Sequence, residues 1–96
     1  MLIQQGTSST PLLFLMVDSS DHLTAKTGLS PSVTLSKCGG GFSAPAGAVT
    51  EIGSGWYKVA GNAADTNTLG PLILHATATG ADPVDSLWEV VAVNVQ

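Results

Sequence analysis

One stretch of this sequence decides its fold class: Ala48-Val49-Thr50-Glu51-Ile52-Gly53-Ser54-Gly55-Trp56-Tyr57-Lys58-Val59. Two short runs rich in β-branched and aromatic residues flank a Gly-Ser-Gly turn, and neither run has the apolar spacing of a helix. In the second run, Tyr57 and Val59 fall on one face and Trp56 and Lys58 on the other, as in a strand with one buried face. The stretch predicts two short strands joined by a tight turn.

The same pattern continues on both sides of this stretch, because turn-forming residues recur about every 8–12 residues. Strands are predicted at residues 11–18, 32–36, 48–52, 56–59, 72–79 and 86–95. Val33 and Leu35 are expected to point inward, as are Leu72 and Leu74. A glycine turn is predicted at residues 38–41. Residues 62–69 are expected to form one helical turn or a tight corner, with Asn62 or Asp65 accepting backbone N–H bonds.

This succession of short strands predicts an all-β fold. Six or seven antiparallel strands in 96 residues favour an immunoglobulin-like antiparallel β-sandwich, with a small barrel as the alternative. A chain of this length fits one domain. We expect residues 11–96 to form that domain and residues 1–10 to form an extended N-terminal arm.

Two of the predicted strands are apolar on both faces. Residues 12–17 are apolar without alternation. In the last strand, one face carries Leu87, Val91, Val93 and Val95, and the other carries Trp88, Val90 and Ala92. A strand that is apolar on both faces is usually covered on both. One cover would be the core of this domain and the other a partner.

The composition points to an assembly component and excludes several other classes. Charged residues make up 10% of the chain, against about 25% in ordinary globular proteins. The net charge is −4, and the cationic side chains are Lys26, Lys37 and Lys58. Nucleic acids and anionic membranes are therefore not expected partners. The longest apolar run, at residues 12–17, is far shorter than the roughly 20 residues of a membrane helix.

Residue types that carry catalysis are scarce, and we predict no enzyme, no cofactor and no metal site. His22 lies in a predicted loop, and His75 lies on the strand face opposite Leu72 and Leu74. Nothing in the sequence brings either histidine to a particular serine, as a catalytic triad requires. The lone Cys38 permits no internal disulfide and reads as a surface thiol in a turn, with an intermolecular disulfide or a reactive nucleophile as alternatives.

The segment Asp18-Ser19-Ser20-Asp21-His22 is the one local cluster with potential metal ligands. A calcium-binding loop would carry more acidic residues at alternate positions. We expect Asp18 and Asp21 to accept turn hydrogen bonds instead.

The two tryptophans have two possible roles. Large aromatic side chains usually lie in a core, but Trp56 and Trp88 each fall opposite an apolar face of their own strand. They are therefore either core residues or anchors in an interface, where such side chains often dominate binding. We also expect Leu2, Ile3, Gln4 and Gln5 to bind a partner, by adding a strand to the open sheet edge of a neighbour.

Several stretches, taken together and in order, resemble a widespread group of small tailed-bacteriophage and prophage proteins with an immunoglobulin-like sandwich. They are PLLFLMVDSSDH at 11–22, KTGLSP at 26–31, AVTEIGSGWYKV at 48–59, ADTNTLG at 64–70 and LHATATGADP at 74–83. At a turn where such sequences often carry Asn-Gly-Gly, this one has Cys38-Gly39-Gly40. The resemblance implies a structural role in the virion and no catalytic residues.

Together, the resemblance, the short chain, the predicted arm and the low charge favour a capsid decoration (cement) protein. Such a protein is made in the host cytoplasm, binds the outside of the head and stabilises contacts of the major capsid protein. We expect homo-oligomers on the particle, and a trimer would fit a symmetry axis of the lattice. The alternatives are a tail, baseplate or fibre adaptor and a module that binds the host surface.

Overall fold

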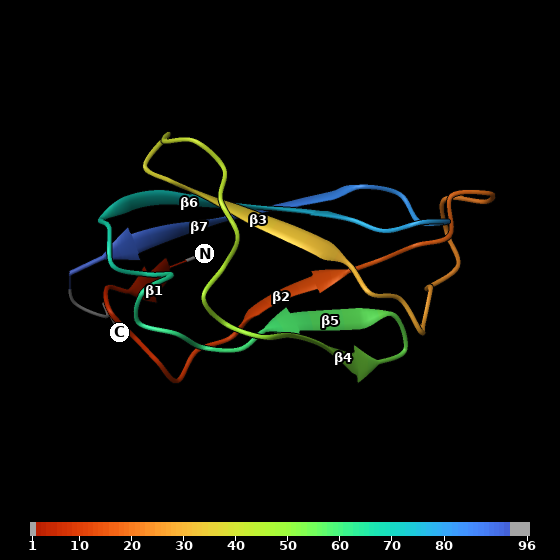
Figure 1. Ribbon diagram of the computed structural model, residues 1–96, viewed down its shortest axis with the longest axis horizontal. Helices are drawn as coiled ribbons and strands as arrows, with labels where there is room; N and C mark the ends of the chain where they lie inside the picture. The colour runs from red at the N-terminus through yellow and green to blue at the C-terminus, as the bar shows by residue number, and fades with distance from the viewer. Residues whose placement is uncertain (1, 93–96) are drawn as a thin grey trace.

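The computed structural model describes residues 2–92, which form two β-sheets and no helix (Figure 1). The strands are β1 (Leu2–Gln4), β2 (Leu12–Leu15), β3 (Ser32–Lys37), β4 (Val49–Gly53), β5 (Trp56–Val59), β6 (Gly70–Thr77) and β7 (Val84–Val91). The all-β prediction is confirmed. Val93 and Val95, placed in the last predicted strand, lie outside the described residues. No helix in residues 2–92 is long and apolar enough to cross a bilayer.

The strands form two layers that pack face to face, and Figure 1 shows β3, β6 and β7 above β2, β4 and β5. One sheet has the order β1-β7-β6-β3 and the other the order β2-β5-β4. Neighbouring strands are antiparallel except β1, which pairs in parallel with β7. The arrangement is compatible with the predicted β-sandwich.

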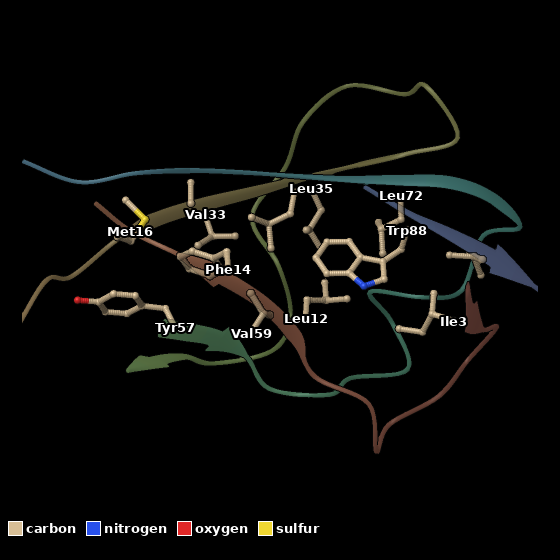
Figure 2. Close-up of a cluster of buried hydrophobic side chains, with 13 residues drawn as sticks. Ile3, Leu12, Phe14, Met16, Val33, Leu35, Tyr57, Val59, Leu72 and Trp88 are labelled. Carbon is tan, nitrogen blue, oxygen red and sulfur yellow. The ribbon is translucent and has the colours of Figure 1, made fainter. Parts of the chain in front are cut away.

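Period-two alternation in both sheets builds the core (Figure 2). The buried apolar side chains are Ile3, Leu12, Phe14, Met16, Val33, Leu35, Tyr57, Val59, Leu72, Leu74, Ala76, Trp88 and Val90. The inward positions predicted for β3 and β6 are confirmed. In β5 the face of Tyr57 and Val59 is the buried one. Across the pair β2–β5, the Phe14 and Tyr57 rings stack with centroids 5.8 Å apart.

Tyr57 also fixes the long loop between β2 and β3. Its hydroxyl donates to the Lys26 carbonyl at 2.9 Å and accepts from the Leu29 N–H at 3.1 Å. A buried hydroxyl needs such partners, because an unsatisfied polar group in a core is costly. The one tyrosine of the chain therefore joins the three-stranded sheet, the core and this loop.

The N-terminal segment is not the extended arm that the sequence suggested. Leu2 lies opposite Glu89 and Gln4 opposite Val91 in a parallel ladder, and Ile3 is only 2% exposed. The ladder continues as the Gln5 N–H donates to the Val91 carbonyl at 2.7 Å. Pairing with β7 satisfies backbone groups and buries the Ile3 side chain, and both effects favour attachment to the chain's own sheet.

The corner between β5 and β6 is held by the two residues predicted to cap it. Asn62 Oδ1 accepts from the Ala64 N–H at 2.9 Å. The Asp65 carboxylate accepts from the N–H groups of Ala46 and Gly47 at 2.7 and 2.9 Å. Asp65 therefore binds the corner to the loop that leads into β4.

Gly47 allows this loop to pass close to β5. A Cβ at Gly47 would lie 2.1 Å from the Ala60 carbonyl oxygen, which is a backbone atom and cannot move alone. We expect Gly47→Ala to lower the free energy of unfolding by about 1–3 kcal/mol through overpacking. Urea unfolding followed by circular dichroism measures the change.

Gly41→Ala is the matched control, since a Cβ added at Gly41 would meet no atom within 4 Å and the φ of this residue is not positive. That variant should change stability by less than about 1 kcal/mol. Equal effects of the two substitutions would contradict the close approach at Gly47.

Candidate functional site

The most distinctive surface feature is an apolar groove between β2 and the first half of β7, which we term the edge groove. Its volume is about 720 Å³. It is lined by Leu2, Thr10, Pro11, Leu13, Phe14, Leu15, Trp56, Val84, Ser86, Leu87 and Trp88. Thr10 and Ser86 are the polar members of this set, and no lining residue carries a charge.

The groove exists because two strand edges are open on the same side of the sandwich. β6 pairs with residues 84–88 on one side of β7, and on the other side β1 pairs only with residues 89–91, so within residues 2–92 no strand lies beside residues 84–88 on the side away from β6. In the described part of the chain, β2 pairs only with β5 and forms the edge of the other sheet. The segment that connects β1 to β2, residues 5–11, forms no strand that would close the gap.

Exposed apolar side chains continue from the groove onto the outer face of the three-stranded sheet. Leu13 is 43% and Trp56 45% exposed. Both also line a second, shallower hollow together with Ile52, Gly53 and Ser54. Residues shared between the groove and the hollow make the surface continuous. We call the exposed side chains Leu2, Leu13, Ile52, Trp56 and Leu87 the apolar edge surface.

This surface accounts for the two strands predicted to need a second cover. On β2, Leu12 and Phe14 are buried while Leu13 is exposed. On β7, Trp88 and Val90 are buried while Leu87 is 61% exposed. One face of each strand therefore meets the core, and no other part of residues 2–92 buries Leu13 or Leu87. Large exposed apolar patches on small proteins usually mark interaction sites.

The six residues predicted to bind a partner are only partly brought together. Leu2 and Trp56 lie at the groove surface, and Trp88 forms part of its lining although it is a core residue at 5% exposure. Ile3 is buried in the core. Gln4 is exposed but does not line the groove, and Gln5 donates through Nε2 to the Asn67 carbonyl at 3.0 Å.

Leu13 and Leu87 are exposed groove residues that sequence reasoning did not assign to partner binding. Both lie in strands recognised as apolar on both faces, and that signal pointed to a covered surface. The pattern could not show which alternate residues face the core, because every position in 12–17 is apolar.

The cluster at residues 18–22 is a hydrogen-bonded turn, as predicted. Asp18 Oδ1 accepts from the Ser20 N–H at 2.8 Å, and Asp21 Oδ1 accepts from the N–H groups of Leu23 and Thr24 at 2.9 and 3.0 Å. Bonds from the Thr24 hydroxyl, then from these backbone groups, lower the pKa of Asp21 to about 2. Residues 2–92 hold no group of three or more His, Cys, Asp or Glu side chains arranged for a metal ion.

The two histidines each bind an aspartate. His22 Nδ1 lies 2.7 Å from Asp82 Oδ2, in the turn between β6 and β7, and this bond raises the pKa of His22. His75 Nδ1 lies 2.7 Å from Asp85 Oδ1 across the β6–β7 pair, and its ring meets Phe42 edge to face. His75 is partly exposed, as predicted. Cys38 is an exposed thiol.

Searches against protein-family models, curated proteins and solved structures found no match to this chain.

The two tryptophans should contribute unequally to the free energy of unfolding. Trp88→Ala removes a buried ring and should lower the free energy of unfolding by about 3–5 kcal/mol. Trp56→Ala removes a half-exposed ring and should lower it by about 1 kcal/mol or less. Urea unfolding of both variants measures this, and a larger loss for Trp56→Ala would contradict the assignment of Trp88 to the core.

The contact between His22 and Asp82 predicts a pH dependence. The folded pKa of His22 is raised above 6.5, so the stability it contributes is present below about pH 6.5 and is lost as pH rises through the folded pKa. Asp82→Asn should lower the NMR titration midpoint of His22 and should destabilise the protein more at pH 5.5 than at pH 8.5.

Asp85→Asn, which removes the partner of His75 instead, is the control. The His22 midpoint should stay unchanged in that variant. A His22 midpoint that does not fall in Asp82→Asn would show that Asp82 is not the cause.

Proposed function

We propose that this protein is a non-enzymatic structural component of a tailed-bacteriophage particle, namely a capsid decoration (cement) protein. In this role it binds the outside of the head and stabilises contacts of the major capsid protein. The observation that carries the proposal is the apolar edge surface, which exposes five large hydrophobic side chains on a small, charge-poor domain. Association with a neighbouring protein would remove this surface from water.

We also propose that the sandwich is immunoglobulin-like. In the standard lettering of that fold, B-E-D are neighbours in one sheet and C-F-G in the other. The orders β2-β5-β4 and β3-β6-β7 match these neighbours when β2 to β7 take the letters B to G. β1 departs from the constant-type arrangement, because it pairs with β7 rather than with β2. This topology supports the fold implied by the resemblance to phage proteins.

The chemistry of the groove favours a protein partner over a sugar. Sugar sites require several polar side chains, and Thr10 and Ser86 are the polar residues that line the groove. A host-surface glycan is therefore a poorer occupant than an apolar segment of a virion protein. The low content of Lys and the absence of Arg from the sequence argue against binding to packaged nucleic acid.

Co-sedimentation with phage particles tests the proposal. Purified protein is mixed with heads that lack it, and with isolated tails in a parallel tube. Saturable binding to heads is expected, at a copy number that follows the lattice symmetry. A trimer at each symmetry axis would give such a copy number. Binding to tails alone would contradict head decoration and indicate a tail or baseplate adaptor. Binding to neither would overturn a virion role.

Leu13→Lys tests whether the apolar edge surface makes the contact. The substitution places a charge on the exposed face of β2 and should weaken head binding at least tenfold. Leu23→Lys is the matched control, because Leu23 is 82% exposed in the loop after β2 and lies outside the surface. Equal binding by both variants would remove the apolar edge surface from the interface.

A further inference from the structure

We propose that the open edge of β7 at residues 84–88 accepts an extended strand from a different protein, as in β-augmentation. The partner strand carries apolar side chains toward the edge groove and a cationic side chain opposite Asp85. This inference names the binding mode of the surface on which the proposed function rests. It reverses the role expected from the sequence, in which this chain was to donate a strand.

The direction of the backbone groups along β7 follows from the ladder of its own sheet. The Cys38 N–H donates to the Pro71 carbonyl at 2.7 Å, so this carbonyl points toward β3. Because backbone groups alternate along a strand, Leu72 and Leu74 point theirs toward β7, where they face Trp88 and Ser86. The N–H and C=O groups of Asp85 and Leu87 then point the other way, toward the edge.

β1 already occupies part of this edge, beside residues 89–91 of β7. The Val91 carbonyl points to the same side and accepts from the Gln5 N–H at 2.7 Å. In residues 2–92, no backbone partner lies on this side of Asp85 and Leu87. A strand added beside them would continue the line of β1 along the same edge.

The groove beside this edge is shaped to receive side chains from such a strand. Val84, Ser86 and Trp88 point inward from β7 and line the groove, together with Phe14 and Leu15 from β2. Alternate side chains of an added strand would point into this space. The lining requires those side chains to be apolar, and the small Ser86 leaves room between its larger neighbours.

The β2 edge borders the same groove. The Met16 N–H donates to the Gly55 carbonyl at 2.9 Å, so the alternation directs the backbone groups of Leu13 and Leu15 outward. The groove therefore has the form of a slot between two sheets from which one strand is missing. We assign the added strand to β7 because β1 already extends that edge.

The charge of Asp85 determines which side chain fits on the outer face of the partner strand. Asp85 and Leu87 point outward, and Asp85 is bound within residues 2–92 only to the partly exposed His75. None of the three lysines lines the groove, and the chain carries a net charge of −4. Natural edges are often protected by lysine or proline, and residues 84–88 contain neither. A Lys or Arg opposite Asp85 is thus the favoured neighbour.

A synthetic peptide tests the inference without phage particles. The probe is the acetylated and amidated heptapeptide Thr-Val-Lys-Val-Thr-Val-Thr. The control has Pro in place of its central Val and of the Thr that follows, which removes a ladder N–H whether the peptide pairs parallel or antiparallel to β7. Amide hydrogen exchange is followed by NMR in the full chain. The probe should slow exchange at Asp85 and Leu87 at least tenfold, and the control peptide should not. Protection at Leu13 and Leu15 instead would overturn the assignment to β7.

A charge reversal provides a second test that does not depend on a change of fold. Asp85→Lys should weaken binding of the probe at least tenfold, and a peptide with Glu in place of Lys should restore it. Glu89→Lys is the matched control, because Glu89 lies on the same strand and face but opposite Leu2 of β1. Equal weakening by both variants would show a general charge effect and overturn the pairing with Asp85.

Results with peptide and particles distinguish this inference from the proposed function. Protection by the probe without binding to heads or tails would support the strand-acceptor edge and overturn the virion role. Binding to heads by Asp85→Lys at wild-type strength, together with no protection of the wild-type protein by the probe, would overturn the strand-acceptor edge alone. Protection of Asp85 and Leu87 that rises with protein concentration in the absence of peptide would make a second copy the occupant and overturn the assignment to a different protein.

Discussion

The stacked pair of Phe14 and Tyr57 is the contact on which this small fold depends. It joins β2 to β5 inside the core, and the hydroxyl of the same tyrosine holds the loop between β2 and β3 at Lys26 and Leu29. β2 is thereby fixed beside β5, its one paired strand among residues 2–92. Its other edge faces outward, and the groove beside β7 follows from that placement.

A short chain cannot cover every apolar face that its strands create. The fraction of surface buried on folding falls as chains become smaller. The protein uses its inward residues for one continuous core, and residues 5–11 form a connection rather than another strand. Leu23, Phe42 and Leu69 are exposed elsewhere, but the other exposed large hydrophobics of residues 2–92 gather in the apolar edge surface. Such a grouping distinguishes an interaction surface from single exposed hydrophobics.

Local patterns predicted the interior of the sandwich well. Alternation in β3 and β6 placed Val33 and Leu74 inward, and glycine-rich turns marked most strand ends. Alternation could not decide the role of Trp88, because it shows which residues share a face but not which face meets the core. The parallel pairing of β1 with β7 had no local signal, since its partners are separated by almost the whole chain. The groove depends on that pairing and was missed for the same reason.

The pairing of the first strand with the last orders the events of folding during synthesis. Ile3 is synthesised before β7, so its parallel pairing with β7 can form only after β7 has been made. Closing a contact of such long range costs chain entropy and is a late step. Until then the nascent chain has two unoccupied lengths of β7 edge rather than one. Once β7 is complete, β1 can pair with residues 89–91, and residues 84–88 then form the part of the β7 edge that stays open.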